Sequence, residues 1–305
     1  MTGRPPQEET TDALQMRQLL CTFRATHIKQ HLQVGEDCWE HIVGGSGSQT
    51  IFIVGGGGSG VESMFSINAA LESCAQVISF CIPTSAATPD RVTDGILAIM
   101  DSLQLRHAVF LGHSLGGLII QSFAVRHPQR IAGLVLANTG FYLGVRAWAL
   151  PAFVALMARL PQALLRRMGG SQMDRLLKPV PAASFWQQFY RNELTEPDAG
   201  ARLKHQGILM LNLIRFFRVH PISPALPWTQ SLPVAIIASQ DDRGFTPRET
   251  AYLGSLYQQS ETTVLPVGTG HLSFLTRPDD YVRLVQQLIV RASTQPSGSS
   301  NASSV

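Results

Sequence analysis

Short apolar runs alternate with longer amphipathic stretches through most of this 305-residue chain, and the alternation limits the folds open to it. The runs consist of β-favouring residues with little polar interruption, as expected of parallel strands that helices cover on both faces. They occupy residues 50–54, 75–82, 107–112, 131–137, 233–239 and 262–267. The helical stretches occupy residues 61–74, 89–103, 115–127, 248–258 and 278–291. This pattern predicts an α/β fold with a mostly parallel, doubly wound sheet.

The alternation breaks once, between residues 141 and 229, where no strand-like run occurs. The segment contains helix-like stretches rich in Leu, Met, Phe, Trp and Arg, and it is too long for a loop. We therefore expect an inserted helical cap at residues 141–229. The α/β core would then consist of residues 27–140 and 230–291.

The two ends of the chain differ from this core in composition. Residues 1–26 begin with a polar, Pro-containing stretch and are interpreted as an N-terminal tail and lead-in. Residues 27–43 favour an antiparallel hairpin at one sheet edge, turning at Gly35. The Ser-rich residues 292–305 are expected to form a disordered tail.

Charge and cysteine content exclude several classes of protein. The net charge is +3, which gives no case for nucleic-acid binding. The four cysteines lack metal-ligand spacing, so we expect no metal site. The N-terminus lacks the apolar core of a signal peptide, and no apolar run reaches the length of a membrane span. These features favour a cytoplasmic location with reduced thiols.

The segment "GHSLG", residues 112–116, marks a candidate nucleophile. It follows a predicted strand and precedes a predicted helix, so it forms a tight strand-to-helix turn. Side chains two residues before and after Ser114 would collide in such a turn, which explains glycine at both positions. The turn exposes the serine hydroxyl at a helix N-terminus, where developing negative charge is favoured.

A serine nucleophile needs a base and an acid that orients the base. In this architecture they follow the serine in the order acid, then histidine, at the ends of later strands. His271 lies in a Gly-flanked loop after the last predicted strand, which favours it as the base. Asp242 and Asp241 both follow the preceding strand, and we take Asp242 as the acid with Asp241 as the alternative.

The glycine run "GGGGSG", residues 55–60, permits several interpretations. Gly55, Gly57 and Gly60 match a dinucleotide-binding fingerprint, but the next predicted strand ends without the acidic residue that binds ribose. A phosphate-binding P-loop would need a lysine after Gly60, and none is present. Acyl transfer needs two backbone donors for its oxyanion. Leu115 supplies one, and Gly57, with Gly56 as the alternative, the other.

Together these residues resemble the α/β-hydrolase superfamily, over residues 27 to 291 and through the motifs "GHSLGG", "SQDDRGFTP" and "GTGHLSF". The family's oxyanion loop usually begins His-Gly, whereas Gly55 and Gly56 stand there in this chain. The stretch from "LGHSLGG" to "LVLANTGF" is also similar to maspardin-like members, some of which act as binding proteins. The resemblance implies a Ser-His-Asp triad beneath a helical cap, without an organic cofactor.

Taken together, these features predict a serine hydrolase that is carboxylesterase-like or thioesterase-like. It would act on a small apolar ester or thioester through an acyl-enzyme. Two alternatives stay open: a non-catalytic binding module, and a lyase, perhydrolase or C–C hydrolase with the same triad. The oligomeric state is not predicted. Candidates for an apolar pocket in the cap are Trp148, Phe153, Met157, Phe185, Trp186, Phe189, Met210, Phe216 and Phe217.

The predicted cap is basic, with eleven Lys or Arg against four Asp or Glu in residues 141–229. This charge is consistent with an anionic portion of the substrate or with peripheral contact at an anionic membrane surface. A solvated face on which arginine stems lie along apolar surface explains it equally well.

Overall fold

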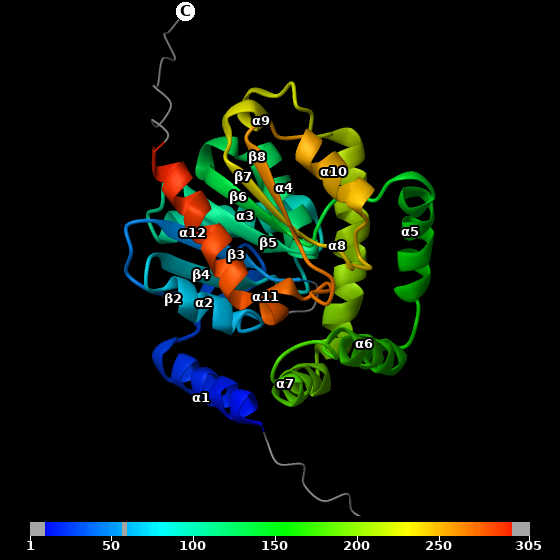
Figure 1. Cartoon of the computed structure of the whole chain (residues 1–305). Coiled ribbons are helices and arrows are strands. Elements are labelled where there is room, and N and C mark those ends of the chain that lie inside the picture. Colours follow the sequence, from blue (N-terminus) through cyan, green and yellow to red (C-terminus); the bar gives the residue numbers. More distant parts are fainter. Residues whose placement is uncertain (1–9, 57–59, 295–305) are drawn as a thin grey trace, which may run out of the picture.

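The computed structural model describes residues 10–56 and 60–294, which form an eight-stranded sheet flanked by helices (Figure 1). The strand order is β1-β2-β4-β3-β5-β6-β7-β8. Pairing is antiparallel for β1 with β2 and for β2 with β4, and parallel for every other pair. The strands are β1 (Gln30–Val34), β2 (Asp37–Gly44), β3 (Thr50–Val54), β4 (Gln76–Cys81), β5 (Ala108–His113), β6 (Ile131–Ala137), β7 (Val234–Ser239) and β8 (Ser260–Leu265). The predicted mostly parallel α/β sheet is confirmed.

Helices cover both faces of the sheet. Successive side chains of a strand point to opposite faces, so Ile51 and Ile53 of β3 pack in one core while Phe52 and Val54 pack in the other. The first core is covered by α1 (Thr11–Thr26), α2 (Phe65–Leu71), α11 (Ser273–Thr276) and α12 (Pro278–Thr294). The second is covered by α3 (Pro89–Ser102), α4 (Leu115–Arg126) and α10 (Pro247–Ser255). This double burial is the reason that the strands read as uninterrupted apolar runs.

The structure adds a helix to the N-terminal lead-in, and it departs from the sequence-based expectation at the C-terminal end. The lead-in predicted at residues 1–26 contains the sixteen-residue helix α1, whose Ala13, Leu20 and Phe23 are buried. At the other end α12 continues to Thr294, so residues 292–294 are helical rather than part of a disordered tail. The edge hairpin turning at Gly35 is present as β1 and β2.

A helical insertion follows β6 and precedes β7. It comprises α5 (Gly144–Met157), α6 (Gln162–Leu176), α7 (Ala183–Thr195), α8 (Ala199–Val219) and α9 (Pro227–Ser231). Helix α8 contacts α4, α3, α5, α6 and α7, and therefore links the insertion to the core. Polar contacts reinforce this link, because Asn212 donates to the Ala87 carbonyl over 2.9 Å. The boundary predicted at residue 229 falls inside α9.

Candidate active site

Ser114 occupies the turn between β5 and α4 with an uncommon backbone conformation. Its φ of 54° and ψ of −119° are disfavoured for a residue that carries a side chain. A Cβ on Gly112 would lie 2.6 Å from the Gly116 carbonyl oxygen, and one on Gly116 would lie 2.1 Å from the Val54 carbonyl oxygen. The Thr139 hydroxyl donates to the Ser114 carbonyl over 2.7 Å. Close packing of the neighbouring backbone thus holds the strained serine at the N-terminus of α4.

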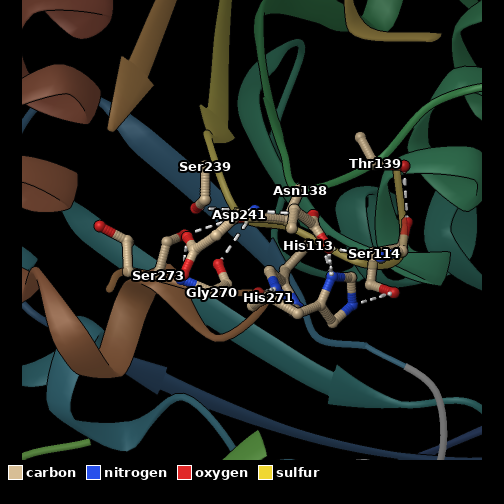
Figure 2. Close-up of polar contacts among 12 residues, drawn as sticks. His113, Ser114, Asn138, Thr139, Ser239, Asp241, Gly270, His271 and Ser273 are labelled. Atoms are coloured by element: carbon tan, nitrogen blue, oxygen red, sulfur yellow. Dashed lines mark hydrogen bonds and ion pairs between the residues drawn. The ribbon is translucent and has the colours of Figure 1, made fainter. Parts of the chain in front are cut away.

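His271 lies between Ser114 and a buried carboxylate. Its Nε2 is 3.0 Å from the Ser114 hydroxyl oxygen, the contact that Figure 2 shows as a dashed line. Its Nδ1 lies 2.9 Å and 3.1 Å from the two carboxylate oxygens of Asp242. The structure thereby brings together three predicted residues from the ends of β5, β7 and β8. The arrangement has the geometry of a nucleophile, a base and an orienting acid.

The Asp242 carboxylate is almost fully buried and well supplied with donors. Its side chain is 2% exposed. The Asn138 side-chain amide donates to one oxygen over 2.9 Å, and the Gly244 backbone N–H donates to the other over 2.6 Å. Burial raises the pKa of Asp242, but the hydrogen bonds and the nearby His271 outweigh burial and hold this pKa below its usual value. The carboxylate therefore stays ionised and accepts from the imidazole.

Asp241 has a different set of partners. One of its carboxylate oxygens accepts from the Gly270 backbone N–H and the other from the Gly268 backbone N–H, each over 2.9 Å. Burial raises the pKa of Asp241, but the hydrogen bonds from these backbone donors outweigh burial, so the net shift of this pKa is downward. Asp241 is exposed and braces the loop that carries His271, whereas Asp242 contacts the ring itself.

His113 is a site residue that sequence reasoning did not single out. It is buried, and its Nε2–H donates to the His271 backbone carbonyl over 2.9 Å. Burial, together with the neighbouring His271, lowers the pKa of His113 to about 3. His113 is therefore a neutral donor that fixes the backbone of the candidate base. Its position inside the Gly-x-Ser-x-Gly motif was the available signal.

Asn138 is a second such residue, directly after β6. It is buried and has a left-handed backbone with a φ of 44°, a conformation that asparagine tolerates well. Its amide nitrogen donates to Asp242 and also to the Ser239 hydroxyl over 3.0 Å, while its oxygen accepts from the Ser273 hydroxyl. Asn138 thus joins the ends of β6 and β7 to the start of α11. Only contacts between residues distant in the chain reveal this role.

Two of the candidate oxyanion donors, Leu115 and Gly56, lie close to Ser114. Leu115 is the first residue of α4, where backbone N–H groups have no acceptor within the helix. Gly56 lies close by, since a Cβ placed on it would be 3.6 Å from the Ser114 Cβ. The alternative donor Gly56 is thus placed beside the serine. Gly57, the preferred donor, lies outside the described residues.

A cavity of about 580 Å³ opens onto Ser114 and His271. Side chains from α5, α6, α7 and α8 line it, and five of the chain's eight methionines contribute: Met64, Met157, Met168, Met173 and Met210. Unbranched thioether side chains adapt to apolar groups of varied shape. The cavity therefore fits a flexible apolar group held close to the serine.

The predicted pocket residues separate into several groups. Three of them line the cavity with Ser114: Phe153, Met157 and Met210. Three others pack around the Phe65 ring in the first core: Phe185, Trp186 and Phe189. Of the remaining three, Trp148 is 80% exposed, Phe216 is buried, and Phe217 lines a second cavity of about 270 Å³ beside α5 and α10.

Neither a metal site nor a membrane span occurs within residues 10–56 and 60–294. No group of three or more His, Cys, Asp or Glu side chains there could hold a metal ion. No helix in this part of the chain combines the length and the apolar character that crossing a bilayer requires.

Comparison with known proteins agrees with this geometry. Residues 84–278 match the family described as the alpha/beta hydrolase fold. The match spans more than half of the chain, so the chain belongs to this family. The predicted family membership is confirmed.

Sequence relatives are named as hydrolases. One relative is a protein of Agrobacterium fabrum that is named as a proposed carbamate hydrolase, RutD. It is 28% identical to this chain, and the alignment covers 68% of this chain and 77% of the relative. The 3-oxoadipate enol-lactonase 2 of Acinetobacter baylyi is 25% identical, covering 66% of this chain and 71% of the enzyme. These names agree with the predicted enzyme class.

Solved structures agree on the fold. A hydrolase from Pseudomonas aeruginosa superposes with a TM-score of 0.68 over 86% of this chain and 98% of that one, at 19% sequence identity. At that identity the likeness establishes the architecture and leaves the substrate open.

Proposed function

We propose that this protein is a serine hydrolase that cleaves carboxylic esters or thioesters carrying an apolar group. The observation that carries the proposal is the continuous series of contacts from Asp242 through His271 to the Ser114 hydroxyl, which faces an apolar cavity. Each contact has the length of a hydrogen bond. A maspardin-like binding module would have no need of this alignment.

The first chemical step follows from the positions of these atoms. His271 Nε2 takes the proton of the Ser114 hydroxyl as its oxygen attacks the carbonyl carbon of the substrate. Asp242 holds Nδ1–H and stabilises the imidazolium that forms. Negative charge develops on the carbonyl oxygen, which accepts from the Leu115 N–H and from a backbone N–H of the glycine loop. His271 then protonates the leaving alcohol or thiol, leaving an acyl-Ser114.

Water completes the cycle. His271 Nε2 accepts a proton from a water molecule as the water attacks the acyl carbon. Ser114 leaves as the alcohol after His271 returns that proton to its oxygen, and the carboxylic acid departs. The overall reaction consumes one ester and one water, and it requires no metal and no redox group.

The lining of the cavity supports an apolar substrate portion. Methionine and phenylalanine side chains from the inserted helices surround Ser114, and the volume of about 580 Å³ lies within the ordinary range for small-molecule sites. The name of the Acinetobacter baylyi relative supports the reaction class, since an enol-lactonase cleaves the ester bond of a lactone.

Turnover of p-nitrophenyl esters from acetate to dodecanoate tests the proposal. We expect hydrolysis that rises with acyl length until the cavity is filled and then declines. Ser114→Ala should abolish it. Absence of turnover for every ester, with the hydroxyl also unreactive toward acylating probes, would instead support a binding module. A product other than the free acid would indicate a lyase or perhydrolase.

A further inference from the structure

Helix α5 is strongly apolar, yet it lies on the surface. Arg146 is its only charged residue, and Val154 is its only buried residue. Val145, Trp148 and Leu156 are exposed to 79%, 80% and 58%. Figure 1 shows α5 at the outer edge of the molecule, with α8 between it and the sheet. Apolar helices of about 10–14 residues are typical of buried cores or of membrane interfaces, and α5 is not in a core.

The stretch of sequence that contains α5 is basic. Residues 141–173 contain four arginines and no aspartate or glutamate. Arg146 pairs with Glu249 over 2.5 Å. Within the described part of the chain, no carboxylate forms an ion pair with Arg159, Arg166 or Arg167. Three uncompensated positive charges therefore follow the exposed apolar face of α5 in the sequence.

This exposed surface is continuous with the rim of the catalytic cavity. Phe153 of α5 and Met168 of α6 are exposed to 57% and 41%, and both also line the cavity that contains Ser114. A binding partner that covers the apolar face of α5 would therefore also contact the entrance to the cavity.

We propose that α5 and the first turns of α6 bind an anionic lipid surface. Trp148 and Leu156 enter the interfacial layer, and Arg159, Arg166 and Arg167 face the lipid phosphates. A second copy of the chain is a poorer occupant, since a two-fold contact through this face would bring the same arginines together. Binding to lipid is independent of catalysis, whereas delivery of an apolar ester from the membrane into the cavity rests on the function proposed above.

Vesicle sedimentation tests the lipid contact without catalysis. The full chain carrying Ser114→Ala would be mixed with vesicles of phosphatidylcholine alone or of phosphatidylcholine with phosphatidylglycerol. We expect binding only to the anionic vesicles. Adding Trp148→Glu should weaken it at least about tenfold, since the tryptophan anchor is replaced by a like charge to the lipid. The matched control is Ile28→Glu, an equally exposed apolar residue at 79% that lies between α1 and β1.

The arginines provide a second, independent variant. Arg159→Gln, Arg166→Gln and Arg167→Gln combined should weaken binding to anionic vesicles by on the order of a hundredfold. If the Trp148→Glu and Ile28→Glu variants bound the anionic vesicles to the same extent, the proposal would be overturned. A dimer that Trp148→Glu converts into a monomer would also overturn it, because this face would then bind a second copy. If the vesicles were bound as expected but the natural protein hydrolysed no ester, the result would count against the proposed function alone.

Discussion

Asp241 and Asp242 are adjacent in the chain, yet their carboxylates act on different parts of the same histidine loop. Asp242 accepts from the His271 ring, and Asp241 accepts from the backbone N–H groups of Gly268 and Gly270. One carboxylate orients the candidate base, and the other sets the path of the backbone that presents it. The two neighbouring carboxylates therefore have different contacts, and we expect them to have different roles.

Replacing each of these aspartates by asparagine should separate the two roles. Asp242→Asn should lower kcat by about 10³–10⁴-fold, because the imidazole loses its charged acceptor and its tautomer changes. Asp241→Asn keeps an oxygen for the loop amides and should lower kcat less than about tenfold. Steady-state kinetics on one p-nitrophenyl ester would measure both. Equal losses in the two variants would show that the roles are assigned wrongly.

Backbone strain at Ser114 predicts an unusual order of stabilities. Ser114→Ala and Ser114→Gly both remove the hydroxyl, but only alanine keeps a Cβ at a φ of 54°. We expect the glycine variant to exceed the alanine variant in free energy of unfolding by about 1 kcal/mol. Urea unfolding of both proteins provides the measurement. A more stable alanine variant, the usual order within a helix, would mean that the turn is not strained.

The lowered pKa of His113 predicts a pH-dependent stability. The folded pKa is about 3, below the ordinary value of about 6.5, so between these values the unfolded chain binds a proton that the folded chain does not. The contribution of His113 is therefore complete above about pH 6.5 and declines as the pH falls toward about 3. By about pH 5 the loss is on the order of 2 kcal/mol.

His113→Gln tests this dependence, because glutamine keeps a donor for the His271 carbonyl but does not titrate. Between about pH 7.5 and about pH 5 its free energy of unfolding should fall less than that of the natural protein, by on the order of 1–2 kcal/mol. Other histidines contribute equally to both proteins and cancel in the comparison. Identical pH profiles would indicate that His113 is not held neutral by burial.

Asn138 should affect stability and turnover together. Asn138→Ala removes the donor to Asp242 and Ser239 and leaves the Ser273 hydroxyl without its acceptor. We expect the free energy of unfolding to fall by about 2–4 kcal/mol and kcat to fall at least about tenfold, with KM nearly unchanged.

The matched control for this variant is Asn68→Ala. Asn68 is equally buried, and its amide donates to the Ser79 hydroxyl over 2.8 Å rather than to a residue of the candidate triad. It should lose stability while keeping kcat. If both variants kept kcat, Asn138 would have only a structural role.

The sheet could be predicted from the sequence because its strands are buried on both faces. The predicted bounds of β3 and β6 coincide with those in the structure. Helix α1 could not be predicted in the same way. Only three of its sixteen residues are buried, namely Ala13, Leu20 and Phe23, so the sequence shows little apolar periodicity. The helix is stabilised by packing on α2 and α7, which are distant in the sequence.

The candidate site shows the same limit. Chain order and strand ends pointed to Ser114, His271 and Asp242, because parallel strands bring their carboxyl ends to one edge of the sheet. His113 acts through a hydrogen bond to the His271 carbonyl, and Asn138 through several bonds to residues more than a hundred positions away. The motif placed His113 beside Ser114, but no local pattern reveals the partners of either residue. Similarly, hydrophobicity alone did not separate cavity residues such as Met210 from core residues such as Phe189.

Covalent labelling tests the central claim, that Ser114 is an activated nucleophile. The natural protein would be treated with a fluorophosphonate, and the modified peptide would be identified by mass spectrometry, with Ser114→Ala and His271→Ala in parallel. We predict a single adduct on the Ser114 oxygen, no adduct in Ser114→Ala, and labelling at least about a hundredfold slower in His271→Ala. Labelling that persists unchanged in Ser114→Ala, or folded natural protein that remains unlabelled, would contradict the account.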